Sequence, residues 1–250
     1  MLSDRQIERY SRQIILPQVG GKGQEALLRS SVLVNESGLL QTSSLLYLAA
    51  AGVGKVGIMS KLCPDLFSSL AVFSDLNPDC QVVMHDETET VDLKQLVQKY
   101  DIILSPPDTR LHAICYELCC PFLCAAMTSS HGWLFSSLGY QPDWPCLHCL
   151  PPQFSENPID SFVNERSLQQ EKGEAFTNLA PNISANFLAS WSPMAMFFGA
   201  LQATEALKLL LGLNQTLARK LWQCHFTPLY FSEHLIEKKP QCPLCGKPSF

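Results

Sequence analysis

The fold of this chain is decided by residues 31–59, SVLVNESGLLQTSSLLYLAAAGVGKVGIM. The apolar run at residues 31–34 predicts a buried strand, helical apolar periodicity follows over residues 38–51, and residues 56–59 predict a second strand. A strand, a turn, a helix and a strand within about thirty residues form a βαβ unit. Such a unit joins two parallel strands by a right-handed crossover, so this stretch predicts the start of a parallel sheet.

The same alternation of strands and helices continues along the chain. Further strands are predicted at residues 81–84, 101–105, 122–126, 221–226 and 229–231, and further helices at residues 3–16, 24–29, 92–99, 109–119 and 192–211. Aromatic-rich runs such as residues 133–140 are more typical of antiparallel strands. We therefore expect an α/β fold: a Rossmann-type, mostly parallel sheet with helices on both faces, extended by antiparallel strands.

The chain has 250 residues, and we expect them to form one domain. Residues 1–128 make up its Rossmann-like half, and residues 129–250 its antiparallel half. Within the second half, residues 155–182 are polar and rich in Asn, Gln, Ser and Glu. A long polar stretch of this kind predicts a mobile loop, and long loops in compact domains are usually functional or disordered.

The composition excludes several classes of protein. The chain carries 18 Lys and Arg against 23 Asp and Glu, a net charge of −5, which argues against a nucleic-acid-binding or polybasic membrane-surface protein. Charged residues make up only 16 %, against about 25 % in typical domains, so we expect a partner subunit to cover part of the surface. We find no secretory signal and no run of about 18 apolar residues, and together with the eleven cysteines this predicts a cytoplasmic location.

Four of the cysteines form two Cys-x-x-Cys pairs, Cys146 with Cys149 and Cys242 with Cys245. Two residues between the ligands let both thiolates point at one tetrahedral centre, and four thiolates close a structural zinc site. The alternative is two unrelated redox or surface pairs. Because four thiolates leave no open coordination position, we expect such a zinc to pin the C-terminal tail to the fold and not to catalyse a reaction.

Several motifs resemble those of the ThiF/MoeB/HesA family of activating enzymes. The matching segments are residues 9–16 (RYSRQIIL), 23–27 (GQEAL), 47–54 (YLAAAGVG), 77–78 (NP) and 199–208 (GALQATEALK), together with both cysteine pairs. The resemblance covers nearly the whole chain. It implies a Rossmann-type fold, usually dimeric, in a protein that uses Mg-ATP to adenylate the C-terminal glycine of a ubiquitin-like or sulfur-carrier protein.

The phosphate-binding turn departs from that family. The family has a Gly-x-Gly-Gly-x-Gly turn here, whereas residues 35–40 read NESGLL and keep one glycine. Glycines let the backbone N–H groups approach phosphate, so we expect Leu40 to block the approach and Glu36 to repel the phosphates. Each repulsive charge pair at 4 Å costs about 1 kcal/mol in water and about 4 kcal/mol at an effective dielectric of 20, as much as the whole binding energy of a millimolar ligand.

Other nucleotide-binding features of the family are missing as well. The second predicted strand ends without the acidic residue that holds the ribose, because the first acid after it is Asp65. The sequence has no arginine between residues 30 and 109, where a triphosphate site needs positive charge. The thioester cysteine of some relatives is replaced by Ser184 and Ala185. We therefore doubt that ATP or magnesium binds.

Two functional positions of the family are retained. Asp108 matches an aspartate that serves Mg-ATP chemistry, although it also fits an N-cap for the helix that follows. Arg12 matches an arginine that reaches into the partner's nucleotide site in family dimers, although it also fits a solvated helix residue.

Three hypotheses follow for the function. The first is a non-catalytic partner that pairs with an active paralogue, or with itself, and takes part in activating a ubiquitin-like or sulfur-carrier protein or peptide. The second is an adenylyltransferase with an altered nucleotide mode that uses Asp108. The third is a homodimeric scaffold that binds an extended peptide along residues 155–182. An NAD dehydrogenase is disfavoured, because the altered glycine turn would also prevent binding of the pyrophosphate group of the dinucleotide.

Overall fold

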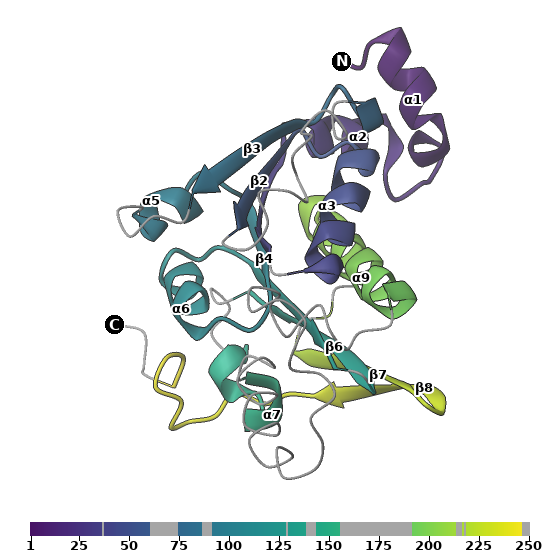
Figure 1. Ribbon diagram of the computed structural model, residues 1–250. Helices are drawn as coiled ribbons and strands as arrows, with labels where there is room; N and C mark the ends of the chain where they lie inside the picture. Colours follow the sequence, from purple (N-terminus) through teal and green to yellow (C-terminus); the bar gives the residue numbers. More distant parts are fainter. Residues whose placement is uncertain are drawn as a thin grey trace, which may run out of the picture.

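The computed structural model describes residues 1–36, 38–60, 75–86, 92–128, 130–138, 144–155, 192–213, 217 and 219–246. These residues form one sheet with the strand order β3-β2-β1-β4-β5-β6-β7-β8 (Figure 1). The strands are β1 (Ser31–Glu36), β2 (Lys55–Ser60), β3 (Gln81–Asp86), β4 (Ile102–Ser105), β5 (Phe122–Met127), β6 (His131–Ser137), β7 (Lys220–Phe226) and β8 (Leu229–Leu235). The helices are α1 (Asp4–Ile14), α2 (Gly20–Arg29), α3 (Leu39–Ala51), α5 (Leu93–Val97), α6 (Thr109–Glu117), η1 (Leu147–Cys149), α7 (Pro152–Ser155) and α9 (Ser192–Leu210).

The first five strands are parallel and the last three run antiparallel. Val32 of β1 lies between Val56 of β2 and Ile102 of β4, both in parallel register. β6 pairs antiparallel with β5, where Phe122 faces Ser137, and β7 and β8 extend the sheet in the same manner. The expected mostly parallel sheet with an antiparallel extension is confirmed, and the change falls between β5 and β6, close to the expected boundary at residue 128.

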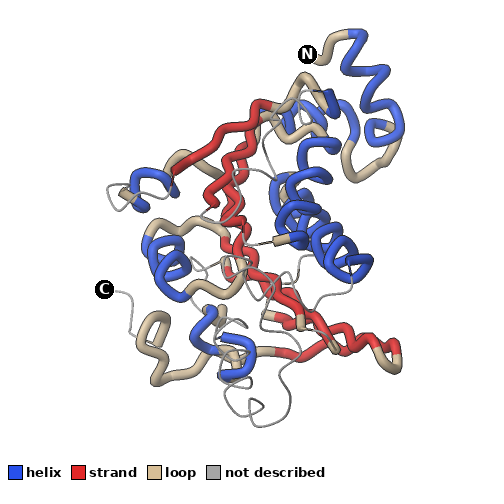
Figure 2. Tube along the Cα trace, viewed as in Figure 1, coloured by secondary structure: helices blue, strands red, loops and turns tan. Residues whose placement is uncertain are grey.

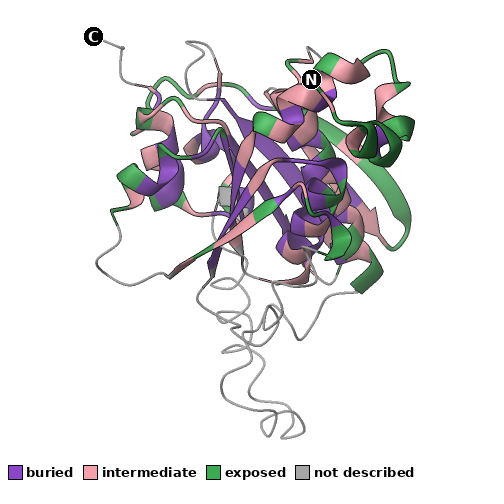
Figure 3. Cartoon of the chain, turned by 90° about the horizontal axis from the view of Figure 1, so that it is seen from above, coloured by how far each residue is buried: buried purple, intermediate pink, exposed green. Residues whose placement is uncertain are grey.

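Helices cover both faces of the sheet (Figures 1 and 2). On one face α3 and α9 pack side by side over an apolar layer that includes Val32, Ile58 and Leu123. On the other face α5, α6 and η1 cover a layer that includes Leu33 and Phe122. Because both faces are covered, the central strands are buried almost throughout, as the purple strands in Figure 3 show.

The N-terminal helices fit their sequence signals only in part. α1 begins with the expected N-cap at Ser3, whose side chain and that of Gln6 form a reciprocal capping box, but it ends at Ile14, two residues short of the prediction. α2 begins at Gly20, four residues earlier than predicted. A glycine-rich segment is typical of a turn, but residues 20–23 here form the first turn of a helix, and a Cβ atom at Gly23 would lie 3.0 Å from the side chain of Leu211.

The predicted loop, the absence of a membrane span and the domain division can be compared with the structure only in part. The predicted loop at residues 155–182 lies outside them, except for Ser155, which ends α7. Among the helices that are described, none is both long enough and apolar enough to cross a membrane. The division of the chain into a single domain with two halves stays a prediction.

Candidate functional site

The carboxyl ends of β1 and β4 form the first candidate site. The chain leaves these neighbouring strands toward opposite faces of the sheet, and ligands of open α/β folds bind in the crevice at such a switch point. At these strand ends, the Asn35 side-chain amide donates a hydrogen bond to the hydroxyl of Ser105 at 3.1 Å. Ser105 is fully buried, so this bond fastens the two strand ends together.

The turn that leads from β1 into α3 lies next to these strand ends. Gly38 is the N-cap of α3, with φ 154°, and the helix begins at Leu39. Leu40 is buried in the core with Leu134 and Phe198. The expectation that the Leu40 side chain blocks the phosphate approach is therefore wrong, because the side chain packs beneath the helix. The side chain of Glu36 and all of Ser37 lie outside the described residues.

The first turns of α3 are held firmly from behind by α9. Gly199 of α9 lies so close to α3 that a Cβ atom there would overlap Ser43 Oγ and the carbonyl oxygen of Leu40. Ser44 Oγ donates to the Gly199 carbonyl oxygen at 3.1 Å and lies 2.9 Å from Gln202 Oε1. These buried contacts fix the N-terminus of α3 through residues that are distant in the sequence.

Asp108 lies just after the carboxyl end of β4, at the same edge of the sheet as the crevice. Its carboxylate accepts a hydrogen bond from the backbone N–H of Leu111 at 2.8 Å, and this confirms the predicted N-cap of α6. The hydrogen bond uses one carboxylate oxygen, and the side chain is half-buried. The structure therefore shows Asp108 as the N-cap of α6 at the carboxyl end of β4, and its role toward Mg-ATP stays a prediction.

Arg12 lies elsewhere in the molecule. It is exposed in the last turn of α1, and it forms no ion pair with any residue that the structure describes. Figure 1 shows α1 and α6 on opposite sides of the sheet, so Arg12 and Asp108 of one chain do not share a site. Such a position is compatible with an arginine that acts on another chain.

A buried polar cluster fixes α1, and no sequence pattern predicted it directly. The hydroxyl of Tyr10 lies 3.2 Å from Asn77 Oδ1 and 3.0 Å from Asp79 Oδ2. The Asn77 amide also donates to the Ala49 carbonyl oxygen at 2.7 Å. Burial raises the pKa of Tyr10 to about 12. Tyr10 and Asn77 belong to two of the motifs quoted above, and their joint membership was the one available hint of this contact.

The second candidate site is a cluster of the four cysteines. Cys146, Cys149, Cys242 and Cys245 are buried, and their sulfur atoms all lie within 4.8 Å of one another. Cys242 Sγ lies 3.4 Å from Cys146 Sγ, and Cys245 Sγ lies 3.3 Å from Cys149 Sγ. Sulfurs bound about 2.3 Å from a tetrahedral zinc lie roughly 3.8 Å apart, so the donor set fits that metal. The structure excludes the alternative of two separate pairs.

Contacts around the cluster tie the C-terminal tail to η1. The backbone N–H of Lys239 donates to Cys149 Sγ at 3.4 Å, and the Lys239 ammonium donates to the Leu150 carbonyl oxygen at 3.1 Å. A hydrogen bond from the Cys146 thiol lowers the pKa of Cys149 below its usual value. At Gly246, a Cβ atom would meet the Pro240 and Cys242 backbone, which explains the glycine after the second pair.

Comparison with known proteins decides the family. The ThiF family profile matches residues 68–244, more than half of the chain. The chain belongs to the ThiF family. The matched segment of this ThiF-family chain includes Asp108 and three of the four clustered cysteines, it ends one residue before Cys245, and it begins after the altered turn at residues 35–40.

Curated relatives share about a quarter of the residues of this ThiF-family chain. It is 27 % identical to the molybdopterin-synthase adenylyltransferase of Escherichia coli K12, covering 98 % of this chain and 99 % of the relative. It is also 27 % identical to the SAMP-activating enzyme E1 of Haloferax volcanii, covering 98 % and 91 %.

Solved structures agree in fold at 15 % identity. Escherichia coli MccB, crystallised with ATP, superposes with a TM-score of 0.68 over 96 % of this ThiF-family chain and 75 % of the MccB chain. PaaA superposes with a TM-score of 0.71 over 94 % and 84 %.

Proposed function

We propose that this chain is a non-catalytic ThiF-family partner or scaffold in the activation of a ubiquitin-like protein, sulfur-carrier protein or peptide. The observation that carries the proposal is the turn at residues 35–40, which has one glycine and whose first residue, Asn35, is hydrogen-bonded to Ser105. A turn with few glycines offers phosphate fewer approachable N–H groups. The names of the relatives, an adenylyltransferase and an activating enzyme, support the reaction context but not catalysis by this chain.

The partner in this proposal is a second copy of the chain or an active paralogue. The low share of charged residues, 16 %, supports a covered surface. Exposed Arg12 would then extend into the partner's nucleotide site, where a guanidinium stabilises negative charge on phosphates. The contacts of Tyr10 with Asn77 and Asp79 hold α1 in place and so position Arg12 for this role. We place the protein in the cytoplasm, where its many thiols remain reduced.

The metal in this proposal is a structural zinc held by Cys146, Cys149, Cys242 and Cys245. Four thiolate ligands leave no open position, so the zinc supplies no reactive water and serves to fasten the tail. ATP and magnesium are not assigned to this chain.

Calorimetric titration of the full chain with Mg-ATP tests the proposal that this chain does not bind the nucleotide. We expect no binding heat at concentrations at which the Escherichia coli molybdopterin-synthase adenylyltransferase, as positive control, gives a saturable signal. Saturable binding to this chain would overturn the proposal. In that case Asp108→Asn should reduce binding if the chain is instead an adenylyltransferase with an altered nucleotide mode, and pyrophosphate exchange would then show turnover.

The trans role of Arg12 is tested in a reconstituted complex with an active paralogue. We expect Arg12→Ala to lower the pyrophosphate exchange of the complex at least about tenfold, the usual scale for a lost charge-assisted contact. Arg5→Ala is the matched control, because Arg5 is also an exposed arginine of α1. If both variants leave the exchange rate unchanged, Arg12 does not act on the partner.

A further inference from the structure

A pocket lies at the amino ends of β4 and β5, the edge of the sheet opposite Asp108 and the crevice. Its volume is about 390 Å³, within the range of small-molecule sites. The residues that line it come from the end of α2, the last turn of α9 and the starts of β4 and β5: Ala26, Arg29, Ser30, Asp101, Ile102, Pro121, Leu209 and Leu210. None of these residues has a role in the proposed function.

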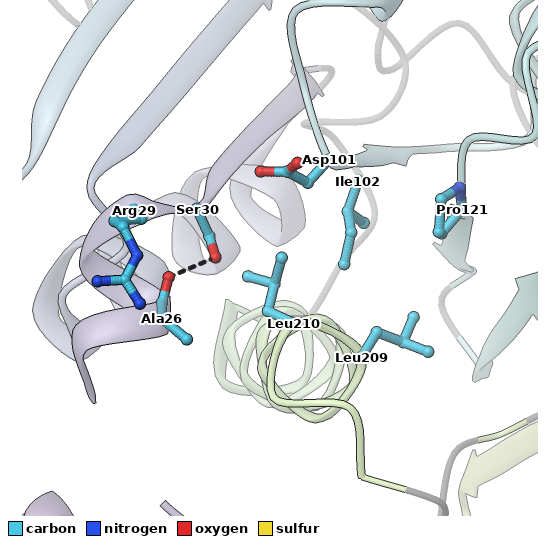
Figure 4. A pocket seen from close by; sticks show the side chains of 8 residues that line it. All are labelled: Ala26, Arg29, Ser30, Asp101, Ile102, Pro121, Leu209 and Leu210. Atoms are coloured by element: carbon cyan, nitrogen blue, oxygen red, sulfur yellow. Dashed lines mark hydrogen bonds between the residues drawn. The ribbon is translucent and has the colours of Figure 1, made fainter. Parts of the chain in front are cut away.

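Polar and apolar side chains line different parts of the pocket (Figure 4). Arg29 and Ser30 lie at one end, Leu209 and Pro121 lie at the other, and Asp101 lies between them with its carboxylate directed toward Ser30. Ile102 is buried, and the leucines of α9 are half-buried, so the apolar end offers a wall from which a ligand can displace water. This separation fits a ligand with a charged head and an apolar tail.

Both charged residues retain binding capacity. Asp101 Oδ2 accepts hydrogen bonds from Ser31 N at 2.8 Å and from Ser31 Oγ at 2.9 Å, while no hydrogen bond from a described residue reaches Oδ1. Among the described residues, the only ion pair of Arg29 is a long one of 3.8 Å with Glu25, and the Arg29 side chain is 70 % exposed. Within the same residues, Arg29 and Asp101 form no ion pair with each other. A cationic group and an anionic group thus both line one pocket and are available to a ligand.

We propose that this pocket binds a zwitterionic α-amino acid with a large apolar side chain. The ammonium group of the ligand pairs with Asp101, its carboxylate pairs with Arg29, and its side chain lies against Leu209 and the neighbouring apolar residues. A nucleotide is disfavoured because its phosphates would lie beside the Asp101 carboxylate. The inside of an extended peptide is disfavoured because it carries neither terminal charge.

Titration of the full chain with L-leucine, followed by saturation-transfer NMR, tests the proposal. We expect saturable binding in the range of about 1 mM, as befits so small a ligand. Leucinamide lacks the carboxylate, N-acetyl-leucine lacks the ammonium and glycine lacks the side chain, and we expect each to bind at least about tenfold more weakly. Absence of binding by leucine, or equal binding of leucinamide or N-acetyl-leucine, would overturn the proposal.

Variants of the protein locate the binding site. Asp101→Asn keeps an acceptor for the Ser31 N–H but removes the charge, and Arg29→Gln removes the guanidinium. We expect both to weaken leucine binding at least about tenfold, whereas Arg5→Gln, on α1, leaves it unchanged. Wild-type affinity in Asp101→Asn and Arg29→Gln would overturn the assignment. Since ATP binding is measured separately, failure of this proposal is distinguishable from failure of the proposed function.

Discussion

Tyr10 and Gly52 show what the retained motif residues do. A Cβ atom at Gly52 would lie 2.7 Å from the Tyr10 ring and 2.6 Å from the Gln24 amide nitrogen, so only glycine allows these side chains to pack there. Gly52 also adopts φ 85°, which favours glycine at the end of α3. Together with Asn77, these residues form a packed polar cluster at the amino edge of the sheet. The retained motifs therefore build the fold, whereas the altered turn lies at the carboxyl edge.

The hydroxyl of Tyr10 is expected to contribute measurably to stability. Tyr10→Phe removes a hydroxyl that bonds to Asn77 and Asp79 and leaves buried polar groups with fewer partners. We expect the free energy of unfolding, measured by urea denaturation, to fall by about 1–3 kcal/mol. Tyr47→Phe is the control, because Tyr47 is 46 % exposed and should change stability by less than about 0.5 kcal/mol. Equal effects of the two variants would show that the cluster is not stabilising.

His112 is expected to make stability depend on pH. The ring is buried, its Nε2 lies 2.9 Å from Ser137 Oγ, and burial, with a smaller effect of His148, lowers the pKa of His112 to about 3. An unfolded histidine has a pKa of about 6.5, so below that pH the unfolded chain binds one more proton than the folded chain. The stability that depends on neutral His112 is complete above pH 6.5 and falls as the pH is lowered toward 3, by up to about 1.4 kcal/mol per pH unit.

Urea denaturation between pH 6.5 and pH 5 measures this slope. His112→Asn cannot titrate, so we expect its stability to fall less steeply with decreasing pH than that of the wild type. His234→Asn is the control, because His234 is exposed, and its slope should equal the wild-type slope. The same slope in His112→Asn and the wild type would mean that His112 binds its proton as readily in the folded protein as in the unfolded chain.

Local signals predicted Asp108 but not Leu40. An N-cap depends on the residue and the next three positions, so sequence sufficed to expect the hydrogen bond from Leu111 N. The direction of the Leu40 side chain depends on where α9 packs, and no local pattern encodes that contact. The cysteine cluster was predictable because the Cys-x-x-Cys spacing is a local pattern. The contact of Tyr10 with Asn77 was not predictable, because it depends on how distant segments pack.

The existence of helices and strands was more predictable than their ends or their order. Apolar runs identified β1 and β2, and the helix predicted at residues 92–99 is present as α5, whose N-cap Asp92 accepts a hydrogen bond from Lys94 N at 2.9 Å. However, α5 ends at Val97 instead of residue 99, and β8 continues to Leu235 instead of ending at residue 231. β8 extends along β7 because its edge pairing depends on register with a neighbouring strand, which periodicity alone does not report.

The contact of α3 with α9 gives a prediction for Gly199. Gly199→Ala would place a methyl group against Ser43 Oγ and the Leu40 carbonyl oxygen, so the helices would have to move apart. We expect the free energy of unfolding to fall by about 1–3 kcal/mol or more. Gly21→Ala in α2 is the control, because no atom lies within 4 Å of the new Cβ and alanine favours the helix. An unchanged stability of Gly199→Ala would mean that the two helices are less closely packed.

At the scale of the molecule, the two candidate sites lie at opposite ends of the parallel strands. The carboxyl edge holds Asp108 and the crevice, and the amino edge holds the pocket of Arg29 and Asp101. The antiparallel strands and the four-cysteine cluster lie at one end, where the tail returns to η1. The tail and η1 are far apart in the sequence. A metal that joins them would therefore fix the tertiary structure of the second half of the chain.

Removal of one of the four cysteine ligands tests whether a zinc ion joins the tail to η1. Cys245→Ser leaves three thiolates, and we expect zinc content, measured by metal analysis after purification, to fall from about one ion per chain to well below one. The melting temperature should fall as well, because metal binding contributes directly to folding of such sites. Cys119→Ser is the matched control, since Cys119 is a free, exposed thiol outside the cluster, and it should keep both values. If wild-type protein carries no zinc, or if Cys245→Ser keeps its zinc and melting temperature, the buried thiols only pack against each other and the tail is held by other contacts, such as those of Lys239.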